Sequence, residues 1–319
     1  MQIVVTDGFT LNPGDLDWQS LRALGEVIIY DRTYPHELIQ RCQSADIIVS
    51  NKTPVNADAI NALHNLKMIS VTATGYNVID VKAAATRKIP VSNVPGYGTA
   101  SVAQHTVALL LELSNQSGLH SRDVSDGGWQ KSIDWCYTIQ PVTELFGKTF
   151  GIIGMGNIGR QVAKIVTALG MKVIYYTPNP KEEFEGEYKS VNEVFSAADV
   201  VSLHCPQTPD NTGFVNASLL SVMKPSAWLI NTSRGGLINE ADLATALKNG
   251  TVKLAALDVL SKEPPPDDHP LIGIPNCLIT PHIAWISKEA RERIMLQTVK
   301  NIQSFINGKA VNVVNSTTD

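Results

Sequence analysis

The stretch that decides the fold is GIIGMGNIGRQVAKIVTALG, residues 151–170, followed by the short apolar run VIYY at 173–176. Its pattern predicts a strand, a glycine turn, a helix and a second strand in succession. Gly154 permits the tight turn, Gly156 lets a pyrophosphate approach the backbone, and Gly159, which opens the predicted helix, lets helix and strand pack closely. Amides at the helix N-terminus then face the phosphate charge. The stretch therefore predicts a dinucleotide-binding site, with a glycine turn that binds no ligand as the alternative.

The second strand of this unit leads into Thr177, a position where dinucleotide sites usually have a carboxylate that binds the ribose hydroxyls. A carboxylate there repels the 2′-phosphate of NADP, so its absence removes the barrier to that cofactor. No arginine follows closely, and Lys181 is the nearest cation. The choice of cofactor therefore stays open, with NAD as the expected cofactor and NADP as the alternative.

The composition is that of a globular chain without a basic surface. With 319 residues, 44% hydrophobic and 18% charged, the chain is long enough for two domains with large buried cores. A formal net charge of -4 and the lack of lysine or arginine runs argue against nucleic-acid and anionic-lipid partners. Without a basic leader or a bilayer-length apolar stretch, we expect a cytoplasmic protein with no membrane partner. The 4 cysteines are widely spaced, so neither a disulfide framework nor a bound metal is expected.

Short β-rich runs alternate with helical segments on both sides of the glycine turn, a pattern typical of doubly wound parallel sheets in an α/β protein. The segment 95–99 interrupts the pattern and predicts a crossing into the second set of strands. The last helix, 288–307, has no strand of its own in the second sheet, so we expect it to return to the first unit. The prediction is a Rossmann dinucleotide-binding domain, 99–283, inserted in a flavodoxin-like substrate domain made of 1–98 and 284–319.

Two loops of the first unit are placed to bind a ligand, because open α/β sheets bind ligands at the carboxyl ends of their strands. NKTP, residues 51–54, follows the third predicted strand, and TATGYN, residues 72–77, follows the fourth. Gly75 can expose backbone amides to a small anion, and Lys52 adds positive charge. These loops predict a carboxylate-binding site, with ordinary turn chemistry as the alternative.

Three polar side chains follow three consecutive predicted strands of the second sheet. Arg234, Glu263 and His282 each lie in the loop after one of these strands. Loops at this edge of a doubly wound sheet face the crevice where a nicotinamide would lie. Each residue taken alone could be a surface cation, a solvated acid or a structural cap, but their convergence favours an active site.

This set of side chains has the chemistry that carbonyl reduction by hydride transfer requires. Negative charge grows on the carbonyl oxygen, and His282 is assigned as the acid that protonates it. Glu263, hydrogen-bonded to the other ring nitrogen, favours the charged imidazolium and fixes its tautomer. The guanidinium of Arg234 can bind the carboxylate of an α-keto acid and polarise its carbonyl. Asp258 is predicted to accept from the nicotinamide carboxamide or, alternatively, to hold a structural turn, and His105 is expected to be a hydrogen-bonded core residue.

These residues resemble the D-isomer-specific 2-hydroxyacid dehydrogenases, and the likeness covers essentially the whole chain. It rests on GMGNIGR, NTSRGG, the LDV and KEP segments, and PHIAW. The resemblance implies the three roles given above for arginine, glutamate and histidine, and a homodimer formed through the nucleotide-binding domain. It also implies that Thr74 and Gly75 hold the substrate carboxylate. Together with the residues argued from their loops, the predicted substrate site is Lys52, Thr74, Gly75, Arg234 and His282. Beyond the three glycines, the cofactor-binding residues assigned with it are Asn157, Ile158, Thr177, Cys205, Pro206, Thr232, Ser233, Arg234, Asp258, His282 and Trp285.

Within this family, the segments TDGFTLNPGDLDW, NKTPV, ATGYN and NVPGYGTASVAQH look most like glycerate dehydrogenases, also called hydroxypyruvate reductases. This likeness implies an oxidoreductase that converts hydroxypyruvate to D-glycerate, often with glyoxylate as a second substrate. A dehydrogenase for glyoxylate or another D-2-hydroxyacid is one alternative. The non-enzyme alternative is an NAD-responsive, corepressor-like binding protein, for which the chain has almost no partner-binding extension.

Overall fold

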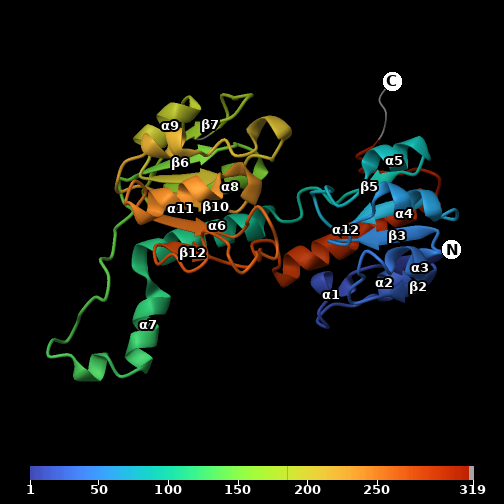
Figure 1. Ribbon diagram of the computed structural model, residues 1–319, viewed down its shortest axis with the longest axis horizontal. Helices are drawn as coiled ribbons and strands as arrows, with labels where there is room; N and C mark the ends of the chain where they lie inside the picture. The colour runs from blue at the N-terminus through green and yellow to red at the C-terminus, as the bar shows by residue number, and fades with distance from the viewer. Residues whose placement is uncertain (185, 316–319) are drawn as a thin grey trace. The chain divides into compact units, whose positions relative to one another are not determined.

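The structure is a computed structural model of the chain, and it describes residues 1–184 and 186–315 (Figure 1). The chain divides into two compact units, Met1–Gly98 with Ile286–Asp319, and Thr99–Trp285. Each unit is built on a parallel sheet of its own. The expected fold class, one doubly wound α/β domain inserted in another, is therefore confirmed. Among the described residues, no helix combines the length and the apolarity that crossing a membrane requires.

The first unit contains a five-stranded parallel sheet in the order β2-β1-β3-β4-β5. Its central strands are buried on both faces, because helices cover both sides of the sheet. The last helix of the chain packs against β4, and its Ile302 is fully buried in the core on that side. The elements are β1 (Gln2–Val5), α1 (Gly8–Leu11), α2 (Gln19–Arg22), β2 (Glu26–Ile29), α3 (Leu38–Cys42), β3 (Ile47–Ser50), α4 (Ala57–Ala62), β4 (Met68–Val71), α5 (Val81–Thr86), β5 (Val91–Ser92) and α12 (Lys288–Ile306).

The second unit contains a seven-stranded parallel sheet in the order β12-β11-β10-β9-β6-β7-β8. The strand order reverses between β6 and β9, which is the point where doubly wound sheets bind ligands. Helices α6 and α8 cover one face and α9, α10 and α11 cover the other. The elements are α6 (Thr99–Asn115), α7 (Ser117–Ser125), η1 (Trp129–Lys131), β6 (Thr149–Ile153), α8 (Asn157–Ala168), β7 (Lys172–Tyr176), β8 (Glu187–Tyr188), α9 (Val191–Ala197), β9 (Val200–Leu203), η2 (Pro209–Asn211), α10 (Ala217–Ser221), β10 (Trp228–Asn231), η3 (Gly235–Leu237), α11 (Glu240–Lys248), β11 (Leu254–Leu257) and β12 (Cys277–Ile279).

The helix after the glycine turn begins earlier than predicted. We expected Gly159 to open it, whereas α8 begins at Asn157 and has Gly156 as its N-cap residue, with extended backbone angles. Gly159 lies inside the first turn of the helix, where its lack of a side chain serves close packing. The prediction was wrong because a glycine inside a helix and a glycine at its start look alike in the sequence.

A long arm leaves the body of the second unit between α6 and β6 (Figure 1). It contains α7 and η1, and α7 has no buried residue. Ile133 and Trp135 beyond them are 102% and 85% exposed, and Trp129 is exposed as well. The arm therefore presents large apolar side chains on a segment that belongs to neither sheet.

Candidate active site

The glycine turn between β6 and α8 has the shape that a phosphate group needs. Gly154 has a φ of +103°, and a Cβ on it would lie 2.5 Å from the backbone nitrogen of Cys205. A Cβ on Gly159 would overlap the carbonyl oxygen of Gly154, so turn and helix approach too closely for any side chain. A Cβ on Gly156 would meet nothing within 4 Å. The backbone at Gly156 is thus open to a ligand, and the turn fits a dinucleotide pyrophosphate.

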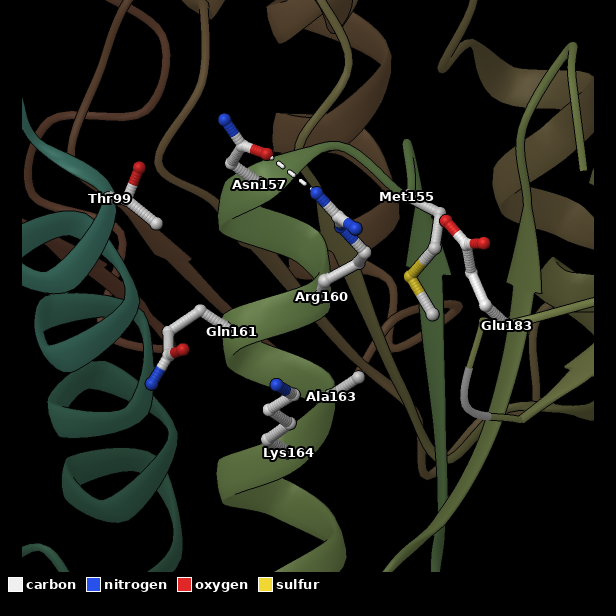
Figure 2. A pocket seen from close by; sticks show the side chains of 8 residues that line it. All are labelled: Thr99, Met155, Asn157, Arg160, Gln161, Ala163, Lys164 and Glu183. Atoms are coloured by element: carbon white, nitrogen blue, oxygen red, sulfur yellow. Dashed lines mark hydrogen bonds between the residues drawn. The ribbon is translucent and has the colours of Figure 1, made fainter. Parts of the chain in front are cut away.

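A hollow runs along α8 beside this turn (Figure 2). At the N-terminal end of the helix, Nη2 of Arg160 donates to Oδ1 of Asn157 at 2.7 Å. The first amides of α8 and the Arg160 guanidinium therefore offer positive charge to a bound phosphate. Sequence reasoning proposed Asn157 for this site and missed Arg160, although Arg160 is the last residue of GMGNIGR. The hollow is lined by Thr99, Met155, Asn157, Arg160, Gln161, Ala163, Lys164 and Glu183.

The loop after β9 meets the glycine turn at the switch point of the sheet, and the loop after β10 bonds to it. Oγ of Ser233 donates to the carbonyl oxygen of Cys205 at 2.6 Å, and Cys205 in turn adjoins Gly154. Burial raises the pKa of the Cys205 thiol to about 11, so this side chain is a neutral, small apolar group. Thr232 is buried, and its Oγ1 lies 2.9 Å from Oγ1 of Thr106 on α6. The Thr232 hydroxyl therefore bonds to the helix packed against the sheet.

The imidazole of His282 and the carboxylate of Glu263 are directly hydrogen-bonded, with 2.5 Å between Nδ1 and Oε2. An ionised carboxylate only accepts, so Nδ1 donates and Nε2 is the ring nitrogen that a substrate can reach. The other carboxylate oxygen, Oε1, accepts from the N–H of Leu260 at 3.0 Å. Both oxygens of Glu263 are therefore engaged, and the orientation of the imidazole is set by a carboxylate that is itself held in place.

Asp258 shapes the loop that contains His282. Its carboxylate accepts from the N–H groups of Ile283 and Ala284, at 2.8 and 2.9 Å. The Thr280 hydroxyl donates to the same carboxylate at 2.6 Å, and the backbone N–H of His282 donates to the Asp258 carbonyl at 2.9 Å. His282 has a φ of +53°, a left-handed conformation that a non-glycine residue adopts only when its surroundings hold it there. These contacts favour the structural-turn alternative for Asp258.

His105 on α6 completes this network. Its Nε2 lies 3.1 Å from Oγ1 of Thr280 and 3.4 Å from Oδ1 of Asp258. Burial opposes ionisation of Asp258, but the hydrogen bonds from His105, from Thr280 and from two backbone amides outweigh it and hold its pKa below the usual range. His105 is hydrogen-bonded as expected, but sequence reasoning missed that it supports the loop of the predicted catalytic histidine.

Arg234 lies on the loop after β10, next to the loop that contains Glu263. Its side chain is exposed. A Cβ on the adjacent Gly235 would overlap the carbonyl carbon of Leu260, so the two loops pack backbone against backbone. The structure thus brings Glu263 and His282 into direct contact and holds Arg234 on the adjoining loop.

The residues predicted to bind the substrate carboxylate lie on two linked loops of the first unit. Lys52 follows β3, and Thr74 and Gly75 follow β4, its neighbour in the sheet. Nδ2 of Asn51 in the first loop donates to the carbonyl oxygen of Thr72 in the second at 2.8 Å. The three predicted residues therefore share one edge of one sheet.

Asp7, which follows β1, was missed by sequence reasoning. Asp7 is buried, and its carboxylate accepts from the backbone N–H groups of Asn51 and Thr53, each at 2.9 Å, and of Lys52 between them. The strand order of the first sheet reverses between β1 and β3, so this cluster lies at its switch point. In the sequence, the feature that could have identified Asp7 was an acidic residue placed directly after a predicted strand.

The sequence and the structure match known proteins along their whole length. Residues 107–284 match the sequence profile of the D-isomer specific 2-hydroxyacid dehydrogenase, NAD binding domain. A hydroxypyruvate reductase from Blautia hydrogenotrophica is 48% identical, over 99% of this chain and 100% of that protein. A glycerate dehydrogenase from Methylorubrum extorquens is 41% identical, over 89% of this chain and 90% of that protein. An NADPH-dependent glyoxylate/hydroxypyruvate reductase from Sinorhizobium meliloti, solved with citrate, superposes with a TM-score of 0.83 at 27% identity, over 98% of this chain and 97% of that one.

The chain belongs to the D-isomer-specific 2-hydroxyacid dehydrogenase family. It is an oxidoreductase with an NAD-binding Rossmann domain, and its class of reaction is hydride transfer at the CH–OH group of a donor. The family resemblance inferred from the sequence is confirmed.

Proposed function

We propose that this protein reduces hydroxypyruvate to D-glycerate with a nicotinamide cofactor and accepts glyoxylate as a second substrate. The observation that carries the proposal is the 2.5 Å hydrogen bond between Nδ1 of His282 and Oε2 of Glu263. It prepares a proton donor beside the Arg234 loop, in a chain 48% identical to a hydroxypyruvate reductase. A protonated imidazole, a carboxylate and a guanidinium together suit reduction of a small keto acid.

In this proposal each side chain has one task. The nicotinamide, when bound, supplies the hydride. Nε2 of His282 donates a proton to the keto oxygen, while Glu263 stabilises the imidazolium before the transfer. The fork of Arg234 binds the substrate carboxylate and polarises the carbonyl. On the first unit, Lys52, Thr74 and Gly75 are the proposed carboxylate-binding residues.

The proposed cofactor contacts lie on the glycine turn and on the loops that follow the neighbouring strands of the same sheet. Thr177 has no charge that would repel a 2′-phosphate, and the Sinorhizobium meliloti relative is named for NADPH. We therefore propose that the protein accepts NADPH as well as NADH. The proposed contacts are Gly154, Gly156, Asn157, Ile158, Gly159, Thr177, Cys205, Pro206, Thr232, Ser233, Arg234, His282 and Trp285.

A cofactor-by-substrate matrix tests this function. NADH and NADPH are each combined with hydroxypyruvate, glyoxylate, pyruvate and phosphohydroxypyruvate, and the loss of absorbance at 340 nm is followed at fixed enzyme concentration. We expect the highest kcat/KM with hydroxypyruvate and measurable turnover with glyoxylate. Comparable rates with all four acids would contradict the assigned substrate, and tight cofactor binding without turnover would favour the corepressor-like alternative.

We also propose a cytoplasmic homodimer formed through the nucleotide-binding domain. The exposed apolar side chains of the arm, Ile133 and Trp135 among them, support this assembly because a second copy of the unit would remove them from water. The unit Thr99–Trp285 is then the cofactor domain and the discontinuous unit is the substrate domain.

A further inference from the structure

A largely buried carboxylate, that of Glu240, contacts the loop that contains Glu263. Glu240 is the first residue of α11, and its side chain is 11% exposed. Its Oε1 accepts from the backbone N–H of Ser261 at 2.7 Å, and its Oε2 accepts from the Ser261 hydroxyl. The backbone N–H and the hydroxyl of one loop residue therefore both donate to one carboxylate.

His269 orients this carboxylate from the other side. Its side chain is 4% exposed, and its Nδ1 accepts from the N–H of Leu271 at 3.3 Å. Because Nδ1 accepts, Nε2 is the protonated nitrogen, and it donates to Oε2 of Glu240 at 3.1 Å. The pair resembles the Glu263–His282 pair in composition, but it is buried and its imidazole has both nitrogens in use.

Glu240 is linked to the proposed catalytic pair through two adjacent residues, Ser261 and Leu260. Ser261 directly follows Leu260, whose N–H donates to Oε1 of Glu263 at 3.0 Å. The turn that contains Glu263 comprises residues 261–268. All of these residues are exposed, so none of them is anchored in a hydrophobic core. The hydrogen bonds to Glu240, the close packing of Gly235 on the buried Leu260, and the contact of Glu263 with His282 join the turn to the rest of the unit.

We propose that Glu240, oriented by His269, is a positioning residue for the Glu263–His282 pair. The inference rests on the proposed function, since it concerns the reaction that His282 serves. Catalytic groups must be held within a fraction of an ångström of their productive geometry, and displacement by about 1 Å can lower a rate about 100-fold. A turn released from Glu240 lets the Glu263 carboxylate rotate away from Nδ1 of His282.

The central variant is Glu240→Gln, which keeps the size of the side chain and replaces an accepting carboxylate oxygen by a donating amide. We expect kcat with hydroxypyruvate to fall by about 10- to 100-fold, while the Kd for NADH changes by less than about twofold, because the glycine turn is untouched. Asp242→Asn is the matched control. Asp242 lies on the same helix and accepts from the N–H of Ala217 at 2.8 Å, away from the turn, so kcat should stay at the wild-type value.

Two further variants keep the inference testable if Glu240→Gln folds poorly. Ser261→Ala removes the hydroxyl contact alone and should lower kcat by a smaller factor than Glu240→Gln. His269→Gln retains a side-chain N–H donor and should preserve more activity than His269→Leu. Equal losses in the two His269 variants would mean that His269 acts only through packing, and the orienting role would be wrong.

A spectroscopic measurement separates this inference from the proposed function. The Nδ1 proton of His282, assigned by its absence in His282→Ala, is followed by proton NMR of the NADH-bound enzyme. We expect its resonance to shift or broaden in Glu240→Gln and to stay unchanged in Asp242→Asn. An unchanged resonance together with wild-type kcat in Glu240→Gln overturns the inference. Absence of keto-acid turnover in the wild-type enzyme overturns the proposed function, while the resonance still reports on positioning.

Discussion

Nδ1 of His282 donates to Oε2 of Glu263 across 2.5 Å, although the two residues are 19 positions apart and follow different strands. The contact forms because β11 and β12 are parallel neighbours, so the loops at their carboxyl ends lie side by side. It fixes which ring nitrogen has the proton and leaves Nε2 for the substrate. The predictions below begin from this pair.

Replacement of the imidazole should greatly slow turnover without abolishing cofactor binding. In His282→Ala the keto oxygen loses its proton donor, and we expect kcat to fall by about 10²- to 10⁴-fold. The Kd for NADH, measured by quenching of tryptophan fluorescence, should remain close to the wild-type value. Turnover within tenfold of the wild-type rate would mean that another group donates the proton.

Neutralising the partner of the imidazole should slow the reaction. The side-chain amide introduced by Glu263→Gln can still accept from Nδ1 of His282, but it lacks the charge that stabilises the imidazolium. We expect kcat with hydroxypyruvate to fall, while the Kd for NADH stays close to the wild-type value because the glycine turn is untouched. A wild-type kcat in Glu263→Gln would contradict the assigned role of Glu263.

The loop of Lys52 should depend on Asp7. Asp7→Asn places a donating amide among three backbone N–H groups, and we expect the Lys52 loop to shift from its position. KM for hydroxypyruvate should rise by about tenfold or more, with little change in the Kd for NADH. Asp46→Asn is the control, because Asp46 accepts from the N–H of Gln2 at 2.7 Å at the opposite end of β1. A similar rise in KM in both variants would indicate a general loss of stability of the first unit.

Asp258 should stabilise the fold in a pH-dependent way. At pH 7, Asp258→Ala leaves buried amides without their acceptor, which should lower the free energy of unfolding by about 1–3 kcal/mol. The pKa of Asp258 in the folded protein lies below its usual value, so this contribution is complete above about pH 4 and is lost as the pH falls below it. Urea unfolding of the wild type and of Asp258→Ala at pH 7 and pH 3.5 measures this difference in the free energy of unfolding, which should be smaller at pH 3.5. A larger difference at pH 3.5 would contradict the prediction.

The arm should be needed for the proposed dimer. Multi-angle light scattering should give twice the mass of one chain for the wild type, and the double variant Ile133→Asp, Trp135→Asp should dissociate, because charged groups cannot be buried there without a partner. The protein concentration at which half of the variant is monomeric, compared with that of the wild type, measures how far the substitutions weaken the dimer. A wild-type monomer at micromolar concentration would show that the arm has another use.

The sequence alone was sufficient for the features that depend on neighbouring residues. A glycine required by a positive φ or by a close backbone approach is visible in the sequence, and this holds for Gly154 and Gly159. The alternation of strands and helices predicted two parallel sheets. The rule that ligands bind at the carboxyl ends of strands then directed attention to Arg234, Glu263 and His282, whose loops follow neighbouring strands.

Only the tertiary structure decided which side chains support those residues. Asp7, His105 and Glu240 are separated by tens of residues from the loops they hold, and strand order and helix packing determine their partners. An acid after a strand, or at the start of a helix, looks the same in the sequence whether it faces solvent or backbone amides. Local chain chemistry therefore determined the fold class and the candidate reaction of this protein, whereas the hydrogen bonds that orient its site required the folded chain, because they join groups that only folding brings together.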